Sequence, residues 1–140
     1  MSKTQKPVTV ITYGTFDLFH YGHVRLLERL SKLGDELIVA CSTDEFNAVK
    51  GKKPCAVPYD HRVYILEACR YVSRVIPETH WEQKRDDIVK YGADIFAMGD
   101  DWEGHFDDLG DLCKVIYLPR TAEISSTELK AQVHASASVA

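Results

Sequence analysis

Short runs of β-branched and other apolar residues alternate along this chain with longer segments in which apolar residues recur every three or four positions. The short runs are bounded by polar residues or glycine, which is the pattern of strands buried inside a sheet. They predict strands over residues 8–13, 36–41, 72–76, 95–98 and 115–118.

The longer segments have the periodicity of helices that bury one face. They predict helices over residues 24–33, 58–71 and 81–91, and a short one over 129–133. Pro58 is well placed to begin the second helix, and Gly34 and Gly92 to end the first and third. Residues 42–57 have neither pattern, and we read them as a polar loop.

This alternation predicts an α/β fold: a Rossmann-like, open, parallel sheet of five strands, with helices on both faces and right-handed crossovers. Sheets of this kind bind ligands beyond the carboxyl ends of their strands. The 140 residues suit one domain over 1–140, without an internal repeat or linker. Residues 1–7 and 134–140 lack a pattern, and we expect them to be flexible.

Composition limits the class of protein and the cellular compartment that the chain can belong to. With 45% hydrophobic and 27% charged residues the chain is globular, and its apolar runs are too short to cross a membrane. The polar start lacks the apolar core of a signal peptide, so we expect a cytoplasmic protein with no membrane partner. The four cysteines form no Cys-x-x-Cys pair and are read as reduced thiols. A net charge of −4 argues against a nucleic acid partner.

Two histidines stand where the first strand leads into the first helix, in Tyr-Gly-Thr-Phe-Asp-Leu-Phe-His20-Tyr-Gly22-His23. Free backbone N–H groups at the start of a helix favour an anion, and imidazoles there add donors. Gly22 would let a phosphate approach the backbone closely. This pattern predicts a small cationic pocket for the phosphates of a nucleotide. Taken alone, the pair could equally be zinc ligands, a satisfied buried pair or a coincidence.

A second cluster follows the last strand, in Arg120-Thr121-Ala-Glu123-Ile-Ser125-Ser126-Thr127. Hydroxyl residues that open a helix are most often only an N-cap. Three successive hydroxyls exceed what one cap requires, and the planar fork of arginine suits phosphate oxygens. The cluster therefore indicates a pyrophosphate site, with the simple cap as the alternative.

Basic residues gather in the middle of the chain, although the net charge is negative. Lys50, Lys52 and Lys53 lie in one loop, and Arg62 and Arg70 lie on the next helix. Anion binding depends on the local field rather than on net charge. A solvated lysine-rich loop remains the simpler alternative.

Read together, these motifs resemble the cytidylyltransferase family, and most of all its bacterial glycerol-3-phosphate members. The resemblance also includes Ser-Thr-Asp-Glu-Phe and Met-Gly-Asp-Asp-Trp-Glu-Gly, and it runs from about residue 8 to 133. It implies a homodimeric nucleotidyltransferase that joins CTP to a phosphorylated alcohol, glycerol 3-phosphate above all, and releases pyrophosphate. Mg²⁺ is expected to arrive with CTP. A CDP-activated alcohol suggests synthesis of a cell-surface polymer, a teichoic acid or a capsule.

The resemblance also implies roles for particular residues. Those expected to act in catalysis are His20, His23, Lys50, Lys52 and Arg120. Those expected to contact the nucleotide are Thr15, Phe16, Gly22, Asp44, Asp101, Trp102, Thr121, Ser125 and Ser126. Arg62 and Arg70 are expected to bind the acceptor phosphate, and Asp17 to orient a histidine or touch metal-bound water. Ordinary alternatives stay open: Asp17 and Asp44 could be caps, and Asp101-Trp102 a simple turn.

Some positions depart from the family pattern. Glu123 stands where these enzymes usually have glycine, Tyr21 replaces a tryptophan, and the loop before Arg62 is slightly longer. These changes leave room for a different acceptor, such as another polyol phosphate or a phosphorylated amide or amino alcohol. Adenylyl transfer and a catalytically silent nucleotide-binding regulatory module are further alternatives.

Overall fold

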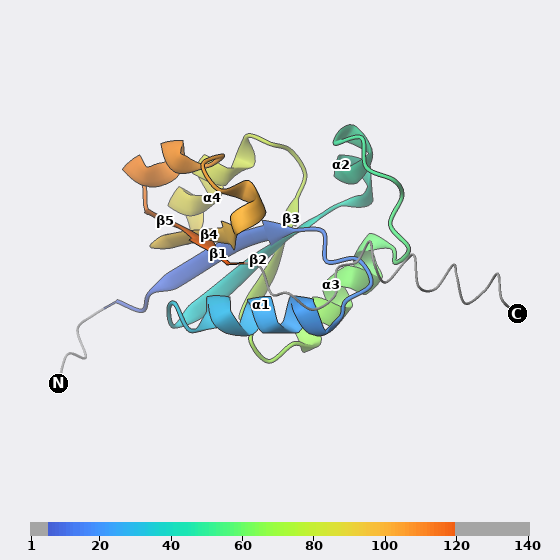
Figure 1. The fold of residues 1–140 in the computed structure, drawn as a ribbon, viewed down its shortest axis with the longest axis horizontal. Helices are drawn as coiled ribbons and strands as arrows, with labels where there is room; N and C mark the ends of the chain where they lie inside the picture. The colour runs from blue at the N-terminus through green and yellow to red at the C-terminus, as the bar shows by residue number, and fades with distance from the viewer. Residues whose placement is uncertain (1–5, 120–140) are drawn as a thin grey trace, which may run out of the picture.

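A five-stranded parallel sheet forms the centre of the protein, of which the computed structural model describes residues 6–119. The strands lie in the order β3-β2-β1-β4-β5, and each neighbouring pair is parallel (Figure 1). They are β1 (Thr9–Gly14), β2 (Glu36–Ser42), β3 (Arg74–Glu78), β4 (Ile95–Gly99) and β5 (Lys114–Leu118). The predicted fold class is confirmed, and a strand is present at four of the predicted positions and close to the fifth.

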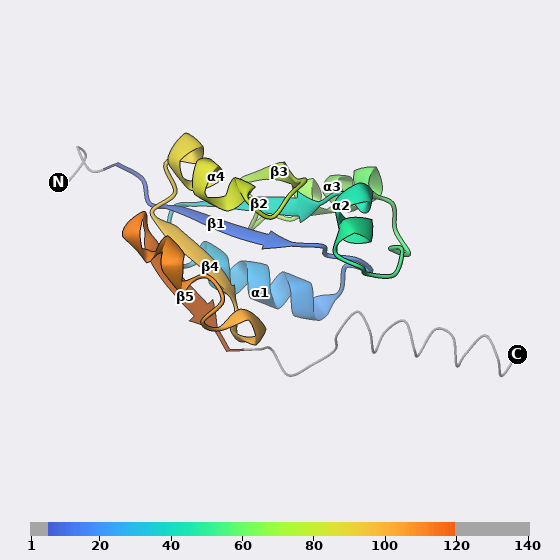
Figure 2. The same ribbon diagram turned by 90° about the horizontal axis from the view of Figure 1, so that it is seen from above.

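Helices cover both faces of this sheet, as predicted (Figure 2). The helices of the described residues are α1 (Tyr21–Ser31), α2 (Asp44–Val49), α3 (Tyr59–Ala68) and α4 (Gln83–Tyr91), with 3₁₀ turns η1 (Asp100–Trp102) and η2 (Asp107–Asp111). Helices α1 and α3 pack on one face, and α4 and η2 on the other (Figure 1). None of the helices between residues 6 and 119 has the length and apolar character needed to cross a membrane.

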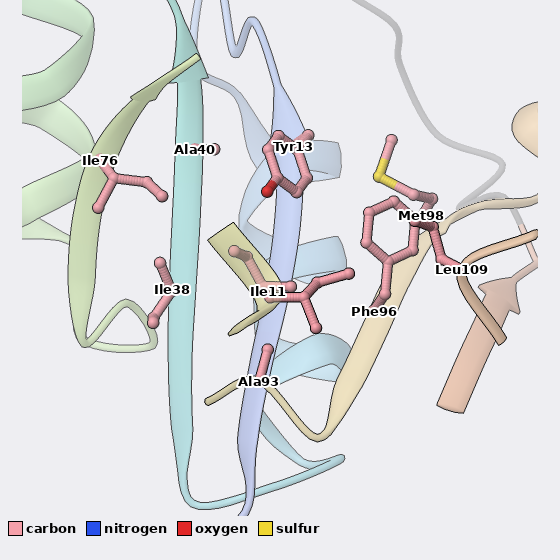
Figure 3. Packing of buried hydrophobic residues seen from close by; sticks show 10 residues of the cluster. Ile11, Tyr13, Ile38, Ala40, Ile76, Ala93, Phe96, Met98 and Leu109 are labelled. Atoms are coloured by element: carbon pink, nitrogen blue, oxygen red, sulfur yellow. The ribbon is translucent and has the colours of Figure 1, made fainter. Parts of the chain in front are cut away.

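Alternation along the central strands divides the core into two layers. On β1, Val10 packs toward α1 and α3, whereas Ile11 and Tyr13 pack toward α4. Figure 3 shows the α4 side of the sheet, with Phe96 of β4 close to these two residues. The side chain of Leu66 is fully buried in the opposite layer. Successive side chains of a strand point to opposite faces of the sheet, so both faces carry apolar residues. Helices pack on these residues and bury the sheet on both sides.

The structure corrects the predicted polar loop over residues 42–57. Its first part is helix α2, capped by Thr43, whose hydroxyl accepts the backbone N–H of Phe46. A helix of six residues has too few turns to show a periodic pattern, so its cap was the available signal. The segment predicted as strand 72–76 pairs instead over 74–78, and includes Pro77. Proline is tolerated there because β3 is an edge strand.

The chain order reverses between β1 and β4, which lie side by side at the centre of the sheet. Loops that leave the carboxyl ends of two such strands diverge to opposite faces and open a crevice between them. The turn that carries His20 leaves β1 at this point, and η1 leaves β4. The fold therefore brings the first histidine motif and the Asp101-Trp102 segment to one edge of the sheet.

Candidate functional site

The turn between β1 and α1 holds an uncommon backbone conformation. Phe16 has a φ of 57° and Leu18 a φ of 49°, values that residues other than glycine seldom adopt. A Cβ atom on Gly14 would lie only 2.7 Å from the Phe16 ring. That ring also packs nearly edge to face against His23, with centroids 5.4 Å apart. Gly14 and Phe16 therefore shape the turn that leads to the two histidines.

The histidines cap the helix on which they lie. Nδ1 of His20 accepts the backbone N–H of Gly22 at 3.1 Å, and Nδ1 of His23 accepts that of His20 at 3.2 Å. The two rings stack with centroids 4.0 Å apart. Because each Nδ1 accepts a hydrogen bond, the proton of each neutral imidazole resides on Nε2. Nε2–H is thus the donor of each ring, at the N-terminus of α1, where anions are favoured.

The charge of this pair differs from the sequence expectation. Burial, and after it the neighbouring His20, lowers the pKa of His23 to about 4. Burial also lowers the pKa of His20. Both shifts favour the neutral imidazole, so the two rings themselves do not support the predicted cationic pocket. Attraction for an anion comes from N–H dipoles and from the end of the helix.

A second charged group lies at the carboxyl ends of β2 and β3. Glu78 pairs with Lys84 at 3.1 Å and with Lys50 at 4.0 Å, and all three side chains are less than 10% exposed. The hydroxyl of Ser42 donates to Glu78 at 2.6 Å and accepts from Lys50 at 3.0 Å. Burial lowers the pKa of Lys50, an effect that Glu78 partly opposes. Two ammonium groups thus share one carboxylate, which leaves the cluster with an excess of one positive charge.

Aromatic rings surround these lysines. Nζ of Lys84 lies 4.8 Å from the centroid of Tyr13, and 5.4 Å from those of Trp81 and Phe106. Nζ of Lys50 lies 4.7 Å from the ring of Phe46. These rings hold the ammonium groups by cation–π attraction and limit their contact with water. The arrangement suits a small anion, whose negative charge would balance the second ammonium group.

Sequence reasoning missed three members of this cluster, namely Glu78, Trp81 and Lys84. Lys84 lies within the helix predicted over 81–91, and its residue type gave no sign of burial, since lysines are seldom buried. The burial depends on Glu78, six residues earlier, and on Tyr13 from another strand. Only the lysine-rich loop gave a sequence signal, through Lys50.

Other predicted residues lie where the loops meet. The hydroxyl of Thr15 donates to the side chain of Asn47 at 3.2 Å. Asp17 is buried and accepts backbone N–H groups. Arg62 is 1% exposed and pairs at 2.7 Å with Asp44, which also accepts the backbone N–H at the start of α3. These contacts tie the turn after β1 to α2 and α3.

The remaining predicted residues in the described part of the chain are more exposed. Lys52 is exposed just beyond α2. Arg70 is exposed just after α3, where it donates to the hydroxyl of Tyr71. Asp101 is exposed and Trp102 half-buried in η1, directly after β4. The structure thus places Asp101 and Trp102 at the carboxyl edge of the sheet. Arg70 lines a pocket together with Phe19 and Val24, which are next to the histidines in the chain.

Four predicted residues lie outside the described residues: Arg120, Thr121, Ser125 and Ser126. So does the predicted helix over 129–133. The last described residue, Pro119, accepts a hydrogen bond of 2.7 Å from the guanidinium of Arg29 on α1. This bond holds Pro119 against the last turn of α1, the helix that begins at the histidines.

The sequence also raised the question of a metal site near Asp17. No group of three or more His, Cys, Asp or Glu side chains that could hold a metal ion occurs between residues 6 and 119. The carboxylate of Asp17 faces backbone N–H groups, which compete with a cation. The described residues therefore do not fit a metal centre built by the protein.

Comparison with known proteins agrees with this picture. A family model described as cytidylyltransferase-like matches residues 11–132. The chain is 60% identical to the glycerol-3-phosphate cytidylyltransferase of Bacillus subtilis, over 89% of this chain and 95% of that one. It is 56% identical to the enzyme of the same name from Staphylococcus aureus, over 89% and 94% of the two chains.

More distant similarities also occur. The FAD synthase of Pyrococcus horikoshii is 34% identical over 82% of this chain and 78% of its own. A lipopolysaccharide core biosynthesis protein from Thermoplasma volcanium superposes with a TM-score of 0.69, at 24% identity over 83% of this chain and 99% of its own. At that identity the superposition supports the fold alone.

Proposed function

The chain belongs to the cytidylyltransferase-like family, and from this membership we propose that it joins CTP and glycerol 3-phosphate to give CDP-glycerol and pyrophosphate. The observation that carries the proposal is 60% identity to a glycerol-3-phosphate cytidylyltransferase over 89% of the chain. That match spans nearly all of the loops that leave the carboxyl edge of the sheet. The protein is thus a nucleotidyltransferase.

In this reaction a phosphate oxygen of glycerol 3-phosphate attacks the α-phosphorus of CTP. A new P–O bond forms, and the bond from the α-phosphorus to the bridging oxygen breaks and releases pyrophosphate. Because no covalent intermediate is needed, positioning and charge stabilisation supply most of the rate. His20 and His23 would donate their Nε2–H groups to the α-phosphate and the bridging oxygen as negative charge develops there.

We place the acceptor phosphate between Lys50 and Lys84. A phosphate dianion would complete the charge balance of two lysines that share Glu78. This role replaces the one expected for Arg62, whose buried side chain is engaged by backbone and Asp44. Arg70 is exposed and belongs to neither the Glu78 ion pairs nor the rings around the two lysines, so we propose at most a peripheral contact between Arg70 and the acceptor.

The nucleotide would span the crevice between β1 and β4. Asp101 and Trp102 would contact the nucleoside, since η1 follows β4 at the point where the sheet order reverses. Lys52 and Arg120 would neutralise the triphosphate. We propose that Mg²⁺ enters as part of the nucleotide complex, because the described residues offer no metal cluster of their own.

Pyrophosphate release with CTP and Mg²⁺ tests this function across a panel of acceptors: glycerol 3-phosphate, other polyol phosphates, phosphoethanolamine and phosphorylated amides. We expect a dominant rate with glycerol 3-phosphate. Stronger turnover with another acceptor would reassign the substrate, and higher activity with ATP than with CTP would favour adenylyl transfer. Absence of turnover with every acceptor would favour a regulatory module.

We also propose a cytoplasmic homodimer that supplies a cell-surface polymer. All four cysteines are free, which suits a reducing compartment. Tyr64 and Ile65 expose apolar surface on α3, as a subunit interface would require. The mass measured by light scattering after size exclusion tests the dimer, and loss of CDP-glycerol-dependent wall or capsule polymer after gene deletion tests the pathway.

A further inference from the structure

Two loops near the carboxyl edge of the sheet contribute basic groups or donors to the proposed reaction. We call residues 15–20, which lead to the helix with both histidines, the histidine loop. We call residues 50–58, which include Lys50 and Lys52, the lysine loop. The lysine loop leads into α3 through Ala56 and Val57, and we call these two residues the return of the loop. The position of the return limits where Lys50 and Lys52 can lie.

Asp17 of the histidine loop holds this return from one side. Its carboxylate accepts the backbone N–H of Ala56 at 2.8 Å and that of Val57 at 2.9 Å. It also accepts the N–H of the next residue, Leu18, at 3.1 Å. Asp17 is only 5% exposed, and hydrogen bonds to a buried charged acceptor are among the stronger ones in proteins.

Arg62 holds the same return from the other side. Its Nε donates to the carbonyl of Val57 at 2.9 Å. One terminal nitrogen donates to the carbonyls of Thr15 at 2.9 Å and Ser42 at 2.8 Å. The other donates to Asp44. One guanidinium thus joins the histidine loop, the end of β2, the start of α2 and the lysine loop.

We propose that Asp17 and Arg62 are positioning residues, forming a buried clamp that fixes the lysine loop against the histidine loop. Their effect on the reaction passes through Lys50, Lys52 and the histidines, and this part rests on the proposed function. The clamp replaces the contacts with metal-bound water and acceptor phosphate expected from sequence. A phosphate could reach Arg62, whose side chain is 0% exposed, only if carbonyls that it now satisfies were left without their donor.

Hydrogen exchange of the unmodified protein gives a first test that needs neither a variant nor activity. The amides of Ala56 and Val57 lie in an irregular segment, yet the clamp should slow their exchange at least on the order of tenfold relative to an unstructured chain. Exchange at the unstructured rate in both amides would overturn the clamp.

Two substitutions then separate positioning from direct contact. Asp17→Asn keeps the size of the side chain but removes one acceptor, and Arg62→Lys keeps the charge but removes the planar fork. We expect faster exchange at Ala56 and Val57 in both variants, and a fall in kcat on the order of tenfold. The KM for glycerol 3-phosphate and the Mg²⁺ concentration for half-maximal rate should stay within about twofold.

The kinetic pattern can also contradict the proposal. A raised KM for glycerol 3-phosphate with unchanged kcat in Arg62→Lys would mean direct contact with the acceptor. A raised Mg²⁺ requirement in Asp17→Asn would mean contact with the metal or its water. Unchanged exchange and unchanged kcat in both variants would likewise overturn the clamp.

Matched controls lie elsewhere on the molecule. Asp35 also accepts a backbone N–H, that of Val8, at the opposite end of β1. Arg85 on α4 pairs with Asp111 of η2. Asp35→Asn and Arg85→Lys should leave the exchange of Ala56 and Val57 unchanged. If no acceptor gave turnover while exchange still rose in the clamp variants alone, the proposed function would fail and the clamp would stand.

Discussion

The backbone N–H of His20, the N-cap of α1, donates to Nδ1 of His23. The imidazole of one proposed catalytic residue thus fixes the backbone of the other. A capping interaction of this kind satisfies a helix N-terminus, where glutamine or glutamate usually takes the position of His23. The structural and the chemical roles of His23 therefore belong to different ring nitrogens, Nδ1 and Nε2. A substitution that keeps an acceptor but removes the donor can separate them.

His23→Gln should make that separation. Glutamine at this position can accept the N–H of His20, so the melting temperature at pH 7.5 should change little. It cannot place a donor where Nε2 lies, so kcat should fall on the order of 10²-fold or more. Steady-state pyrophosphate release measures the change, and the exposed His61→Gln on α3 is the matched control. Near-normal turnover in His23→Gln would remove this imidazole from the mechanism.

Stability should depend on pH through the same residue. The pKa of His23 is about 4 in the folded protein, against an ordinary value of 6.5. Below pH 6.5 the unfolded chain therefore binds a proton that the folded chain does not, and stability falls as the pH drops toward 4. The loss from His23 is at most about 3 kcal/mol. Urea unfolding at pH 7.5 and 5 should show a smaller fall for His23→Gln than for the unmodified protein, and equal falls would contradict the assignment.

Lys84 should control the affinity for the acceptor. Lys84→Met removes one of two ammonium groups, so the KM for glycerol 3-phosphate should rise on the order of tenfold or more, while the KM for CTP changes little. Stability should also fall, because Glu78 keeps only its longer pair with Lys50.

A second variant separates these two effects. In the double variant Lys84→Met/Glu78→Gln, neutralising Glu78 should restore part of the stability but leave the KM high. Lys90→Met, on the exposed face of α4, is the control. An unchanged KM for glycerol 3-phosphate in Lys84→Met would place the acceptor elsewhere.

Arg29 should influence nucleotide binding from outside the site. Its guanidinium holds the carbonyl of Pro119, next to Arg120, at 2.7 Å. Arg29→Gln should therefore raise the KM for CTP about threefold to tenfold, the range of one net hydrogen bond, with little change for the acceptor. Arg25→Gln on the same helix, which loses only a pair with Glu28, should behave like the unmodified protein. Equal CTP affinities in the two variants would show that this contact has no such role.

Gly14 should be sensitive to the smallest enlargement. In Gly14→Ala the new methyl group would meet the Phe16 ring at 2.7 Å, and the buried ring would have to move against His23. We expect a loss of about 1–3 kcal/mol in unfolding free energy and reduced turnover. Gly110→Ala adds a methyl group in open space and should be close to neutral by the same denaturation assay. If Gly14→Ala matched this control, the packing of the turn would not depend on Gly14.

Prediction from sequence worked best where one element repeats a short pattern. The strands around Val39 and Phe96 were predicted because residues buried on both faces form continuous apolar runs. Helix α2 was missed because six residues show no period. The position of β3 was misplaced by two residues, since Pro77 is permitted only by the edge location of the strand, which is a property of the sheet.

For this protein, sequence by itself determined the fold class, the turn that places the histidines at the start of a helix, and the motifs that indicate the family. These features depend on neighbours within a few positions along the chain. The tertiary structure decided the lowered pKa of the two histidines, the burial of Lys84, and the engagement of Arg62 by carbonyls from three segments. Burial and charge pairing join residues far apart in the chain, and a local pattern contains no information about which of them will meet.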